Sequence, residues 1–301
     1  MDIPWEDVEL FLVVAQTGSL SGAARQLRIG QPTVSRRLAA LEYLVGTPLF
    51  LRRPDGVALT TEGERLVEPA RKMAEWAGEV SRAAAASDGR PHGVVRVTAA
   101  PLVCFEYLAP FAAVLARRQL GPRLEVLSTM QYLDLARGEA DLALRGKAPS
   151  QPDLKVVYSF ELENAVFVSP ALAARLPKKP TLAELPWIGW APPFDNIPPQ
   201  PQLEAMIPGF SPAFTSDNFL VHLSAAEAGV GAVVLFRMPS GKEASSLSHR
   251  SRALVPLPID LGAWSTVTVN LVAARSALDV PRVRVVTELL VEELKKISKA
   301  T

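Results

Sequence analysis

The sequence predicts an α/β protein with an N-terminal winged helix-turn-helix, a long linker helix, and a C-terminal region in which strands and helices alternate. Three observations support this prediction. The first 45 residues show helix caps and apolar residues at helical spacing. A heptad pattern of apolar residues follows at 66–84. After a polar linker at 87–93, apolar strand segments alternate with helical segments.

The composition is that of a folded soluble protein, because 49% of the 301 residues are hydrophobic and 21% are charged. Cys104 is the single cysteine, so no intramolecular disulfide is possible and a reducing compartment is expected. The acidic N-terminus lacks the features of a signal peptide, and no stretch of about 18 uncharged apolar residues occurs. We therefore expect a cytoplasmic protein with no membrane partner.

Two helices are expected before residue 28. The first begins after Pro4, where acidic residues favour a helix N-terminus. It ends at Gly18, which can adopt the left-handed conformation. Either Ser19 or Ser21 can cap the second helix.

A third helix follows the tight connection at 28–30, with Gln31 as its cap and Pro32 at its first position, where a missing N–H costs nothing. Ala24 on the second helix permits a close crossing, and Val34 points back at it. These features predict a helix-turn-helix whose third helix is the recognition helix. Its outward face carries side chains that can donate to phosphates and pair with base edges, namely Gln31, Thr33, Ser35, Arg36 and Arg37.

Basic residues are concentrated in this part of the chain. Residues 19–53 carry six arginines against Glu42 alone, whereas residues 1–18 carry four acidic residues and no basic one. A local basic patch on a nearly neutral protein is typical of phosphate binding. The alternative is a solvated polar face without a partner.

A small β-hairpin is expected after the recognition helix. Strands at 49–50 and 57–59 flank the turn Pro54–Gly56. The hairpin forms a wing that presents Arg52 and Arg53, which we also predict to bind DNA.

The long helix is expected to begin at a capping box of Thr61 and Glu64 and to run to about Ser87. Its apolar residues alternate steps of four and three, which is typical of a dimer seam. The seam could instead pack on the chain's own body. We favour dimerisation, because a helix-turn-helix generally needs a symmetric partner to reach two half-sites. The seam residues are Leu66, Ala70, Met73, Ala77, Val80 and Ala84.

The remaining chain is expected to form a parallel, doubly wound sheet, because strands and helices alternate. Prolines are dense between 177 and 212, which predicts irregular loops there. The expected strands are 94–99, 124–127, 141–144, 166–168, 187–190, 231–235 and 266–273, and the expected helices are 105–115, 132–137, 219–228 and a last one from 281.

The chain resembles the LysR-type transcriptional regulators. The resemblance is most specific in the first 66 residues, where many spaced positions agree at once. These positions are Gly18 to Ala24, Gln31 to Leu38, Leu41, Glu42, Gly46, Leu49, Phe50, Arg52, Leu59, Thr60 and Gly63. A weaker resemblance in the rest of the chain depends on Asp141 to Arg145 and Ala228 to Ala232.

The resemblance implies a sequence-specific DNA-binding regulator of transcription that acts on double-stranded operator or promoter DNA. Members of the family are commonly homodimers or homotetramers and often respond to a small-molecule effector. RNA polymerase is a further candidate partner. The family's base and phosphate contacts would fall on Gln31, Pro32, Thr33, Ser35 and Arg36, with Arg52 on the wing.

The resemblance also implies a domain plan. The family's regulatory region looks like a periplasmic binding protein, in which the chain crosses to a second half and returns. On this pattern the winged helix-turn-helix is 1–60, the linker and dimerisation helix is 61–89, regulatory subdomain I is 90–162 with 267–301, and subdomain II is 163–266.

An effector site is expected beyond the carboxyl ends of the strands, where ligands lie in open α/β sheets. The helix start after Ser216 could hold an anion, or Ser216 and Asp217 could simply cap that helix. Trp190 and Phe219 could form an apolar wall or belong to the core. The candidate residues are Ala100, Pro101, Leu102, Val103, Ser128, Thr129, Met130, Arg145, Trp190, Ser216, Asn218, Phe219 and Phe236.

The sequence departs from the family in two loops. The wing tip at 54–58 lacks the basic residue often found there, which would weaken its grip on phosphate. The loop at 100–103 has no hydroxyl, whereas many relatives that bind carboxylates have Ser or Thr there. We therefore expect a fairly apolar small effector, with an aromatic ring as one option.

An enzyme is the main alternative function, but the usual catalytic motifs are absent from the sequence. Cys104 could have a lowered pKa near a helix start, or could be a small buried hydrophobe. We expect no catalytic residue, no cofactor and no metal site. A binding protein that has lost DNA contact is the second alternative. The histidines, which lack metal-ligand spacing, are His92, His222 and His249.

Overall fold

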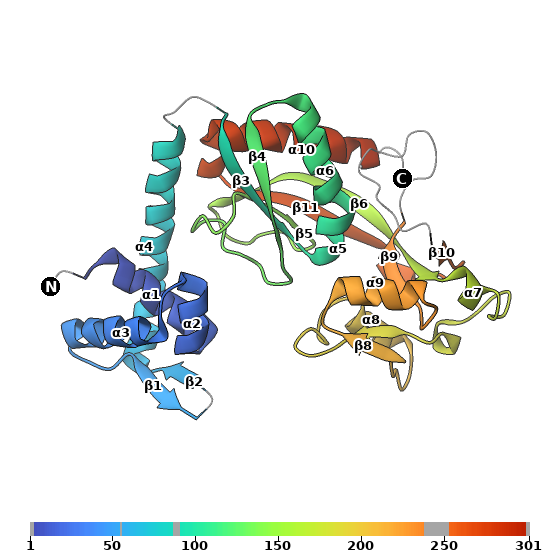
Figure 1. Cartoon of the computed structure of the whole chain (residues 1–301), viewed down its shortest axis with the longest axis horizontal. Coiled ribbons are helices and arrows are strands. Elements are labelled where there is room, and N and C mark those ends of the chain that lie inside the picture. Colours follow the sequence, from blue (N-terminus) through green and yellow to red (C-terminus); the bar gives the residue numbers. More distant parts are fainter. Residues whose placement is uncertain (1–2, 55, 87–90, 238–252, 299–301) are drawn as a thin grey trace. The chain divides into compact units, whose positions relative to one another are not determined.

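The structure is a computed structural model that describes residues 3–54, 56–86, 91–237 and 253–298 (Figure 1). The chain divides into two compact units, one of Met1–Ala85 with Ala136–Gly138 and a second of Ala86–Leu135 with Glu139–Thr301. Residues 87–90 of the predicted linker and Asp55 of the predicted wing turn lie outside the described residues.

The first unit contains three short helices, a hairpin and a long helix, in the predicted order. The helices are α1 (Trp5–Thr17), α2 (Leu20–Leu27), α3 (Gln31–Val45) and α4 (Thr61–Ala86). The antiparallel hairpin pairs β1 (Phe50–Arg53) with β2 (Gly56–Leu59).

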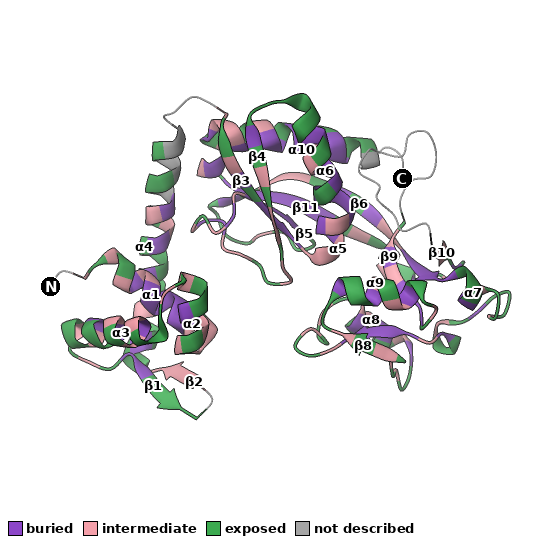
Figure 2. Ribbon diagram, in the orientation of Figure 1, coloured by how far each residue is buried: buried purple, intermediate pink, exposed green. Residues whose placement is uncertain are grey.

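One apolar core holds these helices together (Figure 2). Phe11 from α1 and Val34 from α3 are almost fully buried in it, as is Leu49 before the wing. Ala23 and Ala24 of α2 are buried, and α2 packs against both α1 and α3, so a larger side chain at either position would disturb this packing. The predicted inner face of the recognition helix is therefore correct at Val34.

The helix caps agree with the sequence at α1 and α2 and differ at two later helices. Gly18 ends α1 with φ of 59°, and the Ser19 hydroxyl accepts from the N–H of Gly22 at 3.3 Å. The cap of α3 is Gly30, so the prediction of Gln31 is wrong by one residue.

The predicted capping box at the start of α4 is also wrong by one residue. The Thr60 hydroxyl, and not that of Thr61, accepts from the N–H of Gly63 at 3.0 Å. Its hydroxyl also donates to the Pro48 carbonyl at 2.9 Å, which joins the helix start to the chain before the wing. This second contact favours Thr60 as the cap.

The predicted seam of α4 divides into two parts. Leu66 and Ala70 pack on the core of the first unit, as the alternative interpretation allowed. Met73 and Val80 are exposed, and the neighbouring Trp76 is 72% exposed. Ala77 is half-buried and Ala84 is exposed.

The second unit is built on a seven-stranded mixed sheet. Strands β4 (Pro122–Ser128), β3 (Gly93–Ala99) and β5 (Leu142–Arg145) are parallel neighbours. Strand β11 (Thr266–Ala274) then lies antiparallel between β5 and β6 (Leu154–Val168). The predicted parallel sheet is thus correct for β4, β3 and β5 and wrong beyond them, because the returning chain pairs in the opposite direction.

Helices cover the β3–β4 part of this sheet. A helical segment begins at Pro101 and continues without a break through α5 (Pro101–Val103), a π-helical turn η1 (Cys104–Leu108) and α6 (Ala109–Arg118). The C-terminal helix α10 (Pro281–Ser298) packs against β3, β4, β6 and α6.

The second half of this unit is attached to the far end of β6. There β6 pairs with β9 (Val233–Phe236) and β10 (Val255–Pro256). A separate parallel pair is formed by β7 (Ile188–Trp190) and β8 (Phe214–Ser216). The remaining elements are α7 (Pro170–Ala173), α8 (Gln200–Met206), α9 (Phe219–Glu227) and the short turns η2 (Leu182–Glu184), η3 (Gly262–Trp264) and η4 (Ser276–Asp279).

The helix predicted at 132–137 is wrong, because this segment is an irregular stretch that ends in a turn at 135–138. The Leu133 carbonyl accepts a hydrogen bond from Nη2 of Arg145. The Asp134 N–H donates to the Glu139 carboxylate at 2.7 Å. These partners satisfy backbone groups that a helix would otherwise bond internally.

Candidate functional site

The recognition helix α3 has one buried and one exposed face. Val34, Leu38 and Leu41 are buried on the inner face. On the outer face Gln31, Pro32 and Arg36 are exposed, and Thr33 and Ser35 are half-buried. The polar residues predicted to meet DNA therefore lie on the free side of a rigidly packed helix.

Arg37 differs from its neighbours on α3. Its Nε donates to Oδ1 of Asp7 on α1 at 2.7 Å, and the Asp7 side chain is only 13% exposed. The ion pair joins α1 to the recognition helix. Asp7 was not a predicted site residue, since an acidic residue in a first helical turn already has a simpler explanation.

The wing is held to α3 by Glu42. Its carboxylate accepts from the N–H groups of Leu49 at 2.7 Å and Phe50 at 3.1 Å, where β1 begins. Arg52 and Arg53 are exposed further along β1. Glu42 was not a predicted site residue, and its isolation among basic residues was the available signal.

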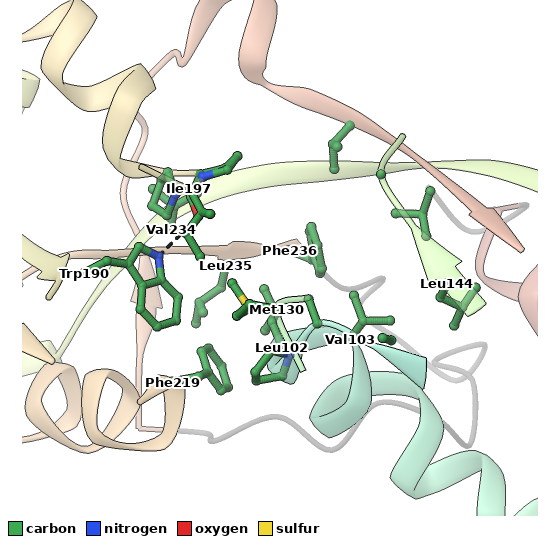
Figure 3. Close-up of a pocket in the computed structure, with 18 of the residues that line it drawn as sticks. Leu102, Val103, Met130, Leu144, Trp190, Ile197, Phe219, Val234, Leu235 and Phe236 are labelled. Carbon is green, nitrogen blue, oxygen red and sulfur yellow. Dashed lines mark hydrogen bonds between the residues drawn. The ribbon is translucent and has the colours of Figure 1, made fainter. Parts of the chain in front are cut away.

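A cavity of about 470 Å³ lies within the second unit, beyond the carboxyl ends of β3, β4 and β5 (Figure 3). Its volume falls in the range of small-molecule sites. Elements of both halves line it, with Leu102 and Met130 from the first and Trp190 and Phe219 from the second. The predicted effector residues that line it are Ala100, Pro101, Leu102, Val103, Thr129, Met130, Arg145, Trp190, Phe219 and Phe236.

Three predicted effector residues are not among those that line the cavity: Ser128, Ser216 and Asn218. The Ser216 hydroxyl accepts from the N–H of Asn218 at 3.2 Å. The Asn218 side chain in turn accepts from the N–H of Leu220 at 2.9 Å and caps α9. Both polar groups are thus engaged by the start of that helix, with Asn218 as the cap.

The cavity also contains lining residues that the sequence analysis did not select. Asn164 donates to the Trp264 carbonyl at 2.9 Å, and both residues line the cavity. The His222 ring packs against the Trp190 ring at a tilt of 47°, with 4.3 Å between centroids, and its Nε2 is 2.8 Å from the Ser216 carbonyl. Because α9 was predicted, its helical spacing from Phe219 was a usable signal for His222.

Burial changes the pKa of three groups in the second unit. It lowers the pKa of the His222 imidazole and of the Arg145 guanidinium. It raises the pKa of the Cys104 thiol, whose Sγ is 3.3 Å from the Ala99 carbonyl. Cys104 is thus the small buried hydrophobe of the two interpretations.

The described residues contain no group of three or more potential metal ligands. Nor does any described helix combine the length and apolar character needed to cross a membrane.

Comparison with known proteins identifies both units. Residues 5–64 match the family described as bacterial regulatory helix-turn-helix protein, lysR family, and residues 88–295 match the LysR substrate binding domain. The HTH-type transcriptional regulator CrgA of Neisseria meningitidis serogroup C is 29% identical over 170 residues, which is 56% of this chain and 57% of that protein. In this alignment the chain spans little more than half the length of its relative.

Two further similarities extend over more of the chain. The Mau operon transcriptional activator of Paracoccus denitrificans is 26% identical over 232 residues, which is 77% of this chain and 78% of that protein. The solved structure of CrgA is 26% identical and has a TM-score of 0.53, covering 97% of this chain and 99% of its own. From its two matched domains, the chain belongs to the LysR family of bacterial helix-turn-helix regulators.

Proposed function

We propose that the protein binds a specific operator in double-stranded DNA and regulates transcription, with α3 in the major groove. The observation that carries this proposal is the exposed polar face of α3 over a buried apolar one. Gln31 is suited to a base edge, and Arg36 on α3, like Arg52 and Arg53 on the wing, is suited to phosphates.

The test is selection of bound duplexes from a random-sequence pool, followed by gel shifts with the selected operator. Arg36→Ala should weaken operator binding and reduce its salt dependence. The matched change Arg118→Ala, on the exposed surface of the second unit, should leave operator binding unchanged. Operator binding by Arg36→Ala that equals wild type at every salt concentration would remove α3 as the recognition element.

The protein is further proposed to act as a homo-oligomer that pairs through α4. Met73, Trp76 and Val80 present apolar surface there, with Val80 69% exposed. Trp76→Glu should shift the sedimentation coefficient toward a smaller species. Arg71→Glu, which also introduces a glutamate but on the opposite side of the same helix, serves as the control. A wild-type protein that sediments as a monomer would contradict this part of the proposal.

A small effector is proposed to bind in the cavity and alter DNA binding. The proposed subdomains, 90–162 with 267–301 and 163–266, agree with the change of partners along β6, from β11 to β9 and β10. The mostly apolar lining supports an apolar effector. A ligand screen by thermal shift, repeated with operator present, tests this, and a preference for small dicarboxylates would contradict it.

A further inference from the structure

Arg145 is the one Arg, Lys, Asp or Glu side chain among the described residues that line the cavity. It ends β5 and is only 8% exposed. Its Nη2 donates to the Leu133 carbonyl, and its guanidinium lies 4.8 Å from the centroid of the Tyr132 ring. Its Nε is buried and has no hydrogen-bond partner among the described residues. Asp134 and Glu139 lie close enough to favour its charged form, but neither accepts from Nε. Burial of an unfilled donor is costly, and an anion would supply the missing acceptor.

A second group of donors lies beside Arg145. Ala99 pairs with Leu144 in the parallel register of β3 and β5, so the next residues of the two strands, Ala100 and Arg145, lie side by side. The unbroken helical segment that begins at Pro101 has Ala100 as its cap, with no side chain to accept from the first turn. One anionic group placed here could accept from the backbone as well as from Arg145.

The opposite part of the cavity is apolar and aromatic. Trp190, Phe219, Met130 and Leu102 converge there (Figure 3). Two of its polar atoms already have partners: Nε1 of Trp190 donates to the Pro198 carbonyl at 3.2 Å, and Nε2 of His222 is hydrogen-bonded to the Ser216 carbonyl. This part suits a flat ring and leaves a second charge without a partner.

We propose that the cavity binds an aromatic monocarboxylate, with its carboxylate at Arg145 and its ring against Trp190 and Phe219. The regulatory meaning of this ligand rests on the proposed function, but its binding does not. One carboxylate is specified because one cation is available. Aromaticity is specified because the apolar part includes the rings of Trp190 and Phe219 beside the side chains of Met130 and Leu102.

The experiment is calorimetric titration of the full chain with naphthoate, naphthamide, a naphthalene dicarboxylate and octanoate. These probes hold the ring constant while the charge changes, or hold the charge constant while the ring is removed. In the wild type, Kd for naphthoate should be at least about 10-fold lower than for naphthamide, because a charge-assisted pair is lost in the amide. The dicarboxylate and octanoate should bind more weakly than naphthoate.

Two variants locate the carboxylate. Arg145→Gln should reduce the ratio of the naphthamide Kd to the naphthoate Kd to about one, whereas Arg118→Gln, on the surface and paired with Glu292, should keep the wild-type ratio. Phe219→Ala should weaken naphthoate and naphthamide alike. If Arg145→Gln does not fold, the comparison of the four probes on the wild-type protein still tests whether one carboxylate and one aromatic ring are preferred.

The inference is overturned if naphthamide binds as tightly as naphthoate, if the dicarboxylate or octanoate binds best, or if no probe binds. The same preparations are titrated with the selected operator duplex. Operator binding without naphthoate binding would overturn the ligand class alone. Naphthoate binding without any sequence-specific DNA binding would overturn the proposed function and leave the ligand class in place.

Discussion

Arg36 and Arg37 are neighbours in sequence but should fail in different ways when each is changed to glutamine. Arg36 is exposed, whereas Arg37 is bonded to Asp7 at 2.7 Å. Removing a phosphate contact reduces the salt slope of DNA binding by about 1 and leaves stability nearly unchanged. Removing an ion pair between two helices reduces stability instead. We therefore expect Arg36→Gln to change the salt slope and Arg37→Gln to change the stability of α1 and α3.

The size of the second effect follows from the contact. Hydrogen bonds to charged groups contribute about 1.5–3 kcal/mol. The side chain of Arg37 is 33% exposed, so solvent screening reduces the expected loss to about 1–2 kcal/mol. Amide hydrogen exchange within α1 and α3 should then be about 5- to 30-fold faster in Arg37→Gln, measured by mass spectrometry on the full chain.

Asp7→Asn separates a structural role of Arg37 from a DNA contact by Arg37, because it removes the ion pair without removing a basic charge. If Arg37 holds α3 in place, Asp7→Asn and Arg37→Gln should have similar effects on exchange, and the double variant should be little worse than either. The reasoning is refuted if Arg37→Gln reduces the salt slope by about 1 while Asp7→Asn leaves exchange unchanged. Arg37 would then be a DNA contact, as its position on the helix face first predicted.

Three further changes have expected outcomes. Glu42→Ala leaves the N–H groups of Leu49 and Phe50 without their acceptor and should cost about 2–4 kcal/mol of stability in thermal unfolding; an unchanged Tm would show that water replaces the carboxylate. Gly63→Ala, which stabilises an ordinary helix by about 1 kcal/mol, should destabilise here because its Cβ would overlap the Leu49 carbonyl oxygen; a raised Tm would contradict this close approach. Burial lowers the pKa of His222 below its ordinary 6.5, so the unfolded chain takes up the proton first. Stability should therefore fall as the pH drops below about 6.5, and His222→Gln should flatten this part of the curve; identical pH profiles would contradict it.

The helix-turn-helix could be predicted closely because its signals are local. Gly18 ends one helix with a positive φ and Ser19 caps the next, and both features depend on adjacent backbone alone. The errors are of one residue, at Gly30 and Thr60, where a second candidate cap stood beside the correct one. Thr60 was decided by its contact with Pro48, twelve residues away, which no local pattern contains.

The second unit was harder to predict because its elements depend on distant partners. The first part of β6 was not predicted as a strand, since residues such as Lys155, Glu161 and Glu163 interrupt the apolar pattern. Those polar residues are tolerated because β11 pairs with β6 across more than 100 residues of chain. The irregular segment at 132–137 also depends on a partner outside it, because Arg145 on the following strand donates a hydrogen bond to the Leu133 carbonyl.

Most of the predicted effector residues line the cavity, because strand ends can be located in a sequence without knowing which strands pair. Ligands of open α/β sheets lie beyond the carboxyl ends of the strands, which selects the residue after each predicted strand. Ala100 and Arg145 follow predicted strands, whichever strands pair. This rule cannot select Asn164, which lies in mid-strand where β6 changes partners from β11 to β9. Nor does it select His222, which enters the cavity from the side of α9.

The position of Asn164 bears on how a ligand could act. Its amide donates to the Trp264 carbonyl in the wall of the cavity, next to the point where one half of the sheet gives way to the other. A ligand that contacts Arg145 on β5 and Trp190 on β7 touches both halves at once. Such a ligand favours whichever arrangement of the halves lets both contacts form, and its effect is limited by the difference in affinity between arrangements. A ligand held by one half alone would have no such difference, which is why the pairing of a charged end with an aromatic end matters for regulation as well as for affinity.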